Sequence, residues 1–233
     1  MKKTHRNLFT PTVREKFTAA IRDAIQEVKA GEVVKVSISE GNRKMGAIPS
    51  VSLVPYAACP ASCAKTCAGD CYAANMANFR GTTLRAWARN MALAVYRPEL
   101  YWMQVNAAIS ISRYFRFHVG GDIISPSYFG HMVECARSNP HCDIVAFTKR
   151  HEWVNAWIHE NGQLPRNLHI IMSGWENLDP VNPYGLPETN VVMPGMECPE
   201  SWTHCGGNCS DCARANGGCW AAGCGDVIAF DLH

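Results

Sequence analysis

Ten of the twelve cysteines fall into two short segments of the chain. The N-terminal cysteine loop contains Cys59, Cys63, Cys67 and Cys71. The C-terminal cysteine loop contains Cys198, Cys205, Cys209, Cys212, Cys219 and Cys224. Thiolates that lie a few residues apart can all reach one metal centre, whereas disulfides usually join segments distant in sequence. The spacing therefore favours metal binding over a disulfide scaffold in both loops.

The N-terminal cysteine loop has regular gaps of three residues between its thiols. Tetrahedral zinc usually takes two ligands from one hairpin and two from elsewhere. An iron–sulfur cluster attaches through several irons, so it suits four thiols from a single loop better. We predict a 4Fe–4S cluster here, with zinc and a disulfide pairing as alternatives. A helix starting near Tyr72 would turn its positive N-terminal end toward these thiols.

The C-terminal cysteine loop is rich in glycine, which suits a chain bending around a metal. An auxiliary iron–sulfur cluster and a structural zinc ion are both compatible with its six thiols. Cys135 and Cys142 belong to neither loop, and we expect them to be small buried apolar side chains.

A second group of candidate residues follows a β-like run at 114–119. These are Gly120, Gly121 and Asp122, with His118 two residues before Gly120. Asp122 could accept a hydrogen bond from a cofactor amine or cap the next segment, and His118 could face a pocket or serve a structural role. Ligands of parallel α/β folds bind where strands end, so we expect this group beside the N-terminal cysteine loop.

The surrounding sequence alternates between helical and extended patterns. We predict helices at 12–29, 72–95, 99–112, 127–138 and 151–160, with Ser125 capping the fourth and Gly162 ending the fifth. We predict strands at 33–38, 50–54, 114–119, 143–148, 168–173, 190–193 and 227–230. The alternation indicates a parallel α/β sheet or an open barrel. We expect an α/β domain with an N-terminal helix over 1–195, completed by a cysteine-rich segment over 196–233.

Composition excludes several classes of protein. With 47% hydrophobic and 18% charged residues, the 233-residue chain reads as globular rather than disordered. A formal net charge of +2 gives little support for a nucleic-acid partner. We find no apolar run of membrane-spanning length and no export signal, so we predict a cytoplasmic protein with reduced thiols.

The order of these features resembles the radical S-adenosylmethionine (SAM) superfamily, in which a three-cysteine loop follows the first barrel strand and a Gly-Gly-Glu-like segment ends the next. More closely, the chain is similar to a largely phage-encoded family named gene product 88. The segments that carry this resemblance are Cys59–Ala73, Phe79–Arg80, Arg89–Asn90, Phe117–Asp122 with Tyr128, Ala146–Arg150, Cys209–Trp220 and Val227–His233.

The resemblance implies a partial (β/α) barrel of radical SAM type with a cysteine-rich C-terminal extension. It implies one or two 4Fe–4S clusters and SAM, whose methionine end Gly120, Gly121 and Asp122 would hold. It also implies an electron donor such as flavodoxin or ferredoxin, a bacterial host cytoplasm, and a 5′-deoxyadenosyl radical acting on a substrate that these residues do not identify.

Two points of the resemblance stay open. The usual gaps are three then two, whereas the N-terminal cysteine loop has three gaps of three, so the three thiols that bind the cluster are not fixed. Cys205, Cys209 and Cys212 have the usual gaps, but only one short strand follows them, so we assign them to an auxiliary site. The rival hypothesis is a non-catalytic module, stabilised by zinc or iron–sulfur, that binds nucleic acid or protein.

Overall fold

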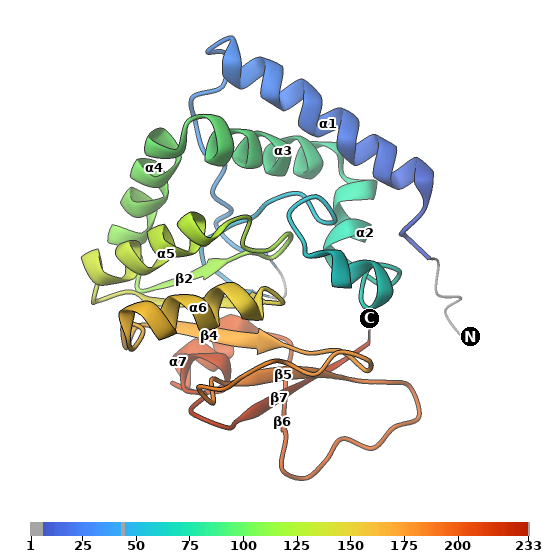
Figure 1. Ribbon diagram of the computed structural model, residues 1–233, viewed down its shortest axis with the longest axis vertical. Coiled ribbons are helices and arrows are strands. Elements are labelled where there is room, and N and C mark those ends of the chain that lie inside the picture. The colour runs from blue at the N-terminus through green and yellow to red at the C-terminus, as the bar shows by residue number, and fades with distance from the viewer. Residues whose placement is uncertain (1–6, 43–44, 233) are drawn as a thin grey trace.

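The computed structural model describes residues 7–42 and 45–232 and contains a seven-stranded sheet. Its strand order is β1-β2-β3-β4-β5-β7-β6, every strand pair is parallel, and the sheet does not close (Figure 1). The strands are β1 Ser50–Val51, β2 Tyr114–Phe117, β3 Asp143–Thr148, β4 Leu168–Ser173, β5 Glu188–Val192, β6 Thr203–His204 and β7 Val227–Asp231. The prediction of a parallel α/β sheet is confirmed.

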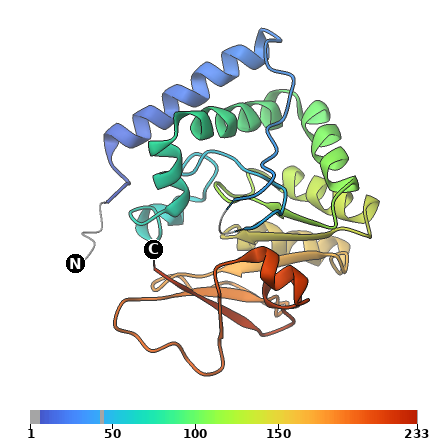
Figure 2. The same ribbon diagram turned by 180° about the vertical axis from the view of Figure 1, so that it is seen from behind.

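The helices lie on both sides of this sheet. They are α1 Pro11–Lys29, α2 Tyr72–Phe79, α3 Gly81–Tyr96, α4 Pro98–Ser110, α5 Pro126–Ser138, α6 His151–Asn161 and α7 Cys209–Arg214, with 3₁₀ turns η1 Ala61–Lys65 and η2 Gly218–Trp220. Helices α5 and α6 cover one face (Figure 1), and α7 lies behind the sheet, as the reverse view shows (Figure 2). Helix α1 packs on α3, where Arg89 pairs with Glu27 at 2.7 Å.

Side chains along each strand point alternately to the two faces of the sheet, so the interior has two cores, one on each face. On β2, Phe115 and Phe117 are fully buried in the larger core beneath the helices, whereas Tyr114 packs against the smaller core on the opposite face. The same alternation places Ile144 of β3 in the larger core and Val145 in the smaller one. Because successive side chains of a strand point to opposite faces, Arg116 shares the face of Tyr114.

Capping residues explain where two helices begin and end. The Ser125 hydroxyl accepts a hydrogen bond from the Tyr128 amide at 3.0 Å, and Pro126 opens helix α5, as predicted. Helix α6 ends at Gly162, whose φ is +81°, which is also as predicted. The predicted helix over 72–95 is instead two helices, because the extended backbone of Arg80 separates α2 from α3.

The predicted strand over 33–38 is wrong, because side chains rather than another strand satisfy its backbone. The side-chain amide of Gln104 accepts from Val36 N at 3.0 Å and donates to the Val34 carbonyl at 2.7 Å. The Asn90 amide accepts from Ser37 N at 2.7 Å and donates to the Ser37 carbonyl at 2.9 Å. The predicted strand over 50–54 is likewise shortened to β1, which pairs in parallel with β2 and forms one antiparallel bridge from Ser50 to Ser39.

Asn90 is expected to contribute strongly to stability. It is fully buried and also donates to the Ser52 carbonyl at 3.1 Å, so Asn90→Ala removes three hydrogen bonds and leaves a buried carbonyl unpaired. We expect a loss of about 1–3 kcal/mol in the free energy of unfolding, measured by urea denaturation. Gln104→Ala, in helix α4, removes one half-buried and one exposed hydrogen bond to the same segment and should cost less. Equal losses from the two variants would contradict this account.

Candidate functional site

The N-terminal cysteine loop follows β1 and leads into helix α2. Turn η1 carries Cys63, which is buried, and Cys71 is the N-cap of α2. The Cys71 sulfur accepts a hydrogen bond from the Ala74 amide at 3.4 Å. The positive end of α2 therefore lies at this loop, as predicted, and favours negative charge on its thiols.

The four thiols of this loop act on one another. A hydrogen bond with Cys59, together with burial, raises the pKa of Cys63 to about 12, although its contact with Cys67 opposes this rise. The contact with Cys63, and then burial, raises the pKa of Cys67 well above its usual range. Burial raises the pKa of Cys71 to about 11. These thiols thus need added positive charge to ionise together, and a bound metal centre would supply it.

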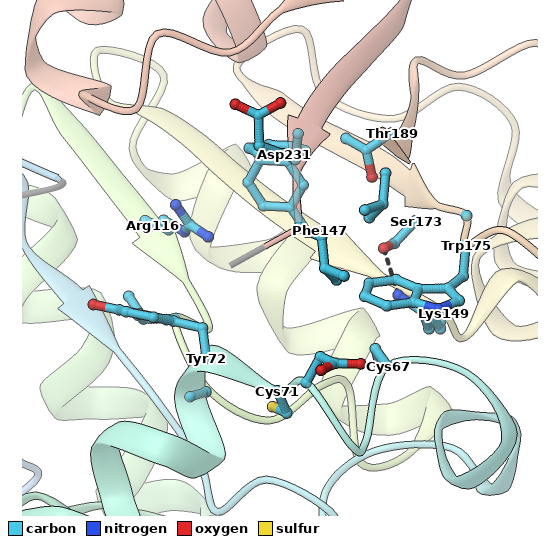
Figure 3. A pocket seen from close by; sticks show the side chains of 17 residues that line it. Cys67, Cys71, Tyr72, Arg116, Phe147, Lys149, Ser173, Trp175, Thr189 and Asp231 are labelled. Atoms are coloured by element: carbon cyan, nitrogen blue, oxygen red, sulfur yellow. Dashed lines mark hydrogen bonds between the residues drawn. The ribbon is translucent and has the colours of Figure 1, made fainter. Parts of the chain in front are cut away.

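A cavity of about 270 Å³ opens between this loop and the strand ends (Figure 3). Cys67 and Cys71 form part of its wall, and residues from the ends of β2, β3, β4, β5 and β7 form much of the rest. Lys149 donates to the Ser173 hydroxyl at 2.7 Å and lies 5.7 Å from the centre of the Trp175 ring. The position of Lys149 also lowers the pKa of Cys63, Cys67 and Cys71 by charge attraction, against the larger effects that raise them.

Gly120 and Gly121 do not line this cavity but allow β2 to end in close contact with its neighbours. A Cβ atom on Gly120 would lie 2.5 Å from the Trp87 ring. Gly121 has a φ of +83°, and a Cβ atom there would lie 2.8 Å from the Cβ of Leu53. The predicted contact of these glycines with SAM stays a prediction, while their packing role is visible in the structure.

Asp122 holds the turn that presents Lys149. Its buried carboxylate accepts hydrogen bonds from the Thr148 hydroxyl at 2.6 Å, the Lys149 amide at 2.9 Å and the Ile123 amide at 2.7 Å. Burial raises the pKa of Asp122, and these three donors oppose the rise. Asp122 therefore positions the end of β3, and its predicted contact with a cofactor amine stays a prediction.

His118 points toward helix α5. Its Nε2 lies 3.0 Å from the Tyr128 hydroxyl, which lies 2.7 Å from the Tyr101 hydroxyl. Burial, and then the nearby Arg116, lower the pKa of His118 to about 3, so its ring is neutral. Nδ1 is buried without a hydrogen-bond partner in the described part of the chain. The contacts of His118 support a structural role against α4 and α5.

The C-terminal cysteine loop gathers four of its six thiols on the face of the sheet opposite α5 and α6. Burial raises the pKa of Cys219 to about 12, and the nearby Cys205, Cys209 and Cys212 each add to this rise. Arg116 opposes that rise and donates to the Cys209 sulfur at 3.5 Å. By contrast, Cys224 is exposed, with its sulfur 2.5 Å from where a Cβ of Gly185 would lie, and the Cys198 sulfur lies 3.8 Å from the Pro199 carbonyl oxygen.

Trp220 anchors this loop to the sheet. Its ring lies 5.0 Å from the Tyr114 ring and packs in the smaller core with Val145 and Ile171, and its Nε1 donates to the Cys209 carbonyl at 3.2 Å. We expect Trp220→Ala to cost about 3–5 kcal/mol of stability and to expose the loop to limited proteolysis. Trp202→Ala removes a half-buried ring from the same segment and should leave the proteolysis pattern unchanged. Identical digestion of the two variants would show that Trp220 is not the anchor.

Residues 7–42 and 45–232 lack two features, a converging set of metal ligands and a membrane-spanning helix. No three His, Cys, Asp or Glu side chains converge as they would on a single metal ion. No helix in these ranges is long and apolar enough to cross a membrane.

Comparison with known proteins identifies one family. The model of the family described as Gene product 88 matches residues 22–201, well over half of the 233 residues. The match includes the whole N-terminal cysteine loop and ends before Cys205, so the resemblance inferred for Cys209–Trp220 lies outside it. No curated protein and no solved structure matches the chain. The chain belongs to the gene product 88 family.

Proposed function

We propose that this protein is a radical-SAM-like iron–sulfur enzyme whose substrate binds in the cavity beside the N-terminal cysteine loop. One observation carries the proposal: a loop of four mutually interacting thiols borders a cavity at the carboxyl ends of a parallel sheet. Reactive centres of parallel α/β folds lie at these strand ends.

The donor set of the N-terminal cysteine loop fits an iron–sulfur cluster. The irons of a cluster attach at separate points, so its thiolates need not converge on one ion. Cys59, Cys63, Cys67 and Cys71 would hold it, some three of them if one iron remains open. The N-terminal end of α2 and the Lys149 ammonium would offset its negative charge. When bound, the cluster and SAM supply a 5′-deoxyadenosyl radical that abstracts hydrogen from the substrate.

The residues of the cavity wall would position the reactants and limit water. Phe147, Trp175 and Phe230 present ring surfaces to the cavity, and the Phe147 and Phe230 rings lie 5.9 Å apart. Ser173 and Trp175 fix Lys149 at the rim, and Asp122 fixes its backbone. In this proposal Asp122 acts through the turn that it holds.

The proposal is tested by purifying the full chain anaerobically and counting bound iron, sulfide and zinc. The reduced protein is then examined by electron paramagnetic resonance with and without SAM. We expect about four irons or more per chain and a spectrum that SAM changes. Zinc in place of iron in both loops would support the binding module instead, and an iron spectrum that SAM leaves unchanged would overturn the enzyme proposal.

A further inference from the structure

Arg116 brings a positive charge into the interior of the molecule. It lies in the middle of β2 on the face opposite α5 and α6, and it lines the cavity (Figure 3). Its guanidinium lies 4.7 Å from the centre of the Phe147 ring, which holds it against the neighbouring strand. The N–H donors of an arginine at this position require hydrogen-bond acceptors.

Most N–H donors of the Arg116 guanidinium have no acceptor among the described residues. A guanidinium has five N–H donors, and the only acceptor that the described residues offer Arg116 is the Cys209 sulfur, at a long 3.5 Å. Its Nε is buried without an acceptor, and no carboxylate in the described chain lies within ion-pair distance of it. A buried donor without an acceptor is unfavourable, so the site favours an acceptor that the described residues do not provide.

The acidic residues of the cavity do not fill this role. Asp231 pairs with His204 at 3.1 Å, and its carboxylate points away from Arg116 (Figure 3). Asp70 belongs to the N-terminal cysteine loop, next to Cys71. Lys149, the other cation of the described cavity wall, donates to the Ser173 hydroxyl at 2.7 Å, whereas the bond from Arg116 to the Cys209 sulfur is long at 3.5 Å. Of these two cations, Arg116 thus has more unfilled donors for a ligand.

The walls beside Arg116 are apolar and include two aromatic rings. Phe147 and Phe230 meet edge to face at 5.9 Å, and Val119 and Val191 complete this part of the lining. Rings of this kind favour a flat apolar body, while the planar fork of a guanidinium favours the paired oxygens of a carboxylate or phosphate. A cavity of about 270 Å³ suits a small molecule.

We propose that the cavity binds an aromatic oxyanion, a carboxylate or phosphate attached to a flat ring, with its oxygens on Arg116 and its ring against Phe147 and Phe230. This ligand assignment depends on the proposed function in one respect, which is that the proposed enzyme would use the ligand as its substrate. Arg116 determines the specificity of the cavity for charged ligands, because a neutral ligand of the same shape would leave the guanidinium donors unpaired.

Calorimetric titration of the full chain, purified anaerobically, tests the proposal with three probes of one shape. These are 2-naphthoate, 2-naphthyl phosphate and the neutral 2-naphthamide. We expect at least one oxyanion to bind about tenfold or more tightly than the amide, because charged hydrogen bonds contribute about 1.5–3 kcal/mol. The oxyanion that binds more tightly shows whether the ligand carries a carboxylate or a phosphate. Equal affinity for all three probes, or no binding of any, would overturn the proposal.

Variants locate the oxyanion within the cavity. Arg116→Gln should weaken oxyanion binding about 10- to 100-fold and leave amide binding unchanged, whereas Lys149→Met should weaken it less than about threefold. Arg113→Gln removes the same charge from an exposed position just before β2 and serves as the matched control. Arg116→Lys retains the charge without the fork, so it reports on binding even if the glutamine variant does not fold. A larger loss from Lys149→Met than from Arg116→Gln would contradict the assignment.

The outcomes separate this inference from the proposed function. Arg116-dependent oxyanion binding in a protein whose spectrum ignores SAM would refute the enzyme and keep the ligand class. A SAM-responsive protein with no preference for oxyanions would keep the enzyme and refute the ligand class.

Discussion

Under the proposed iron–sulfur function, combining Cys63→Ala with Cys67→Ala is expected to abolish iron binding at the N-terminal cysteine loop. Cys63 lies at the centre of the thiol contacts, because it bonds to both Cys59 and Cys67. The double variant leaves two thiols in the loop, fewer than the three that a cluster with an open iron needs. We expect a loss of about four irons per chain, and a fall of more than about 10³-fold in formation of 5′-deoxyadenosine from SAM.

The two cysteines outside both loops provide a matched control. Cys135 and Cys142 are buried in the larger core, so a Cys135→Ala and Cys142→Ala double variant removes the same number of sulfur atoms away from the site. It should retain iron and SAM cleavage. If iron falls equally in both double variants, the loss reports unfolding. If the Cys63 and Cys67 variant keeps its full iron and its SAM cleavage, the cluster does not lie in the N-terminal loop.

Gly121→Ala is expected to be among the most destabilising single substitutions in this chain. The backbone of Gly121 has a φ of +83°, which costs a residue with a Cβ about 1–2 kcal/mol. The new methyl group would also lie 2.8 Å from the Leu53 Cβ and 3.1 Å from the Ala58 Cβ, and both neighbours are buried. Overpacking adds about 1–3 kcal/mol, so we expect a total loss of about 2–5 kcal/mol in urea denaturation.

Gly130→Ala is the control for this prediction. Gly130 lies within helix α5, and a Cβ atom there would meet nothing within 4 Å. This variant should gain about 0.5–1 kcal/mol of stability, since alanine favours the helix over glycine. The prediction fails if Gly121→Ala unfolds at the same urea concentration as the wild-type chain, because Gly121 would then have room that the structure does not show.

Local sequence patterns correctly predicted the elements that are stabilised by burial of their own apolar residues. Strands β3 and β4 begin and end where predicted, because apolar runs buried on both faces give a strong signal. The 33–38 segment has the same composition as a strand, but Asn90 and Gln104 occupy its backbone groups. Those partners lie more than fifty residues away in sequence, so no local pattern could reveal them.

The candidate site was predicted in part. The sequence placed the N-terminal cysteine loop at the end of a strand, and the structure has it there beside a cavity. Arg116 was not singled out, although a charged residue within an alternating apolar strand was a usable signal. The role of Asp122 depends on Thr148 and Lys149 from the next strand, and only the paired sheet brings these groups together.

The thiols of the C-terminal loop are brought together in part. All six are candidate ligands by spacing, and within the described chain Cys205, Cys209, Cys212 and Cys219 act on one another. The sequence spacing of the cysteines identifies thiols that can reach one metal centre. The direction of the backbone between them decides which thiols do reach it. Glycines at positive φ, such as Gly207 and Gly218, set that direction, and their conformation is not encoded in spacing.

The two ends of the open sheet bear on how this protein avoids aggregation. A sheet that does not close keeps two outer strands, whose free backbone groups can recruit strands from other molecules. Here both outer strands, β1 and β6, are only two residues long. Beside β1, Ser39 exchanges both backbone hydrogen bonds with Ser50 at 2.8 Å. The sheet therefore offers little template for pairing between molecules, and lengthening β6 would be the direct way to create one.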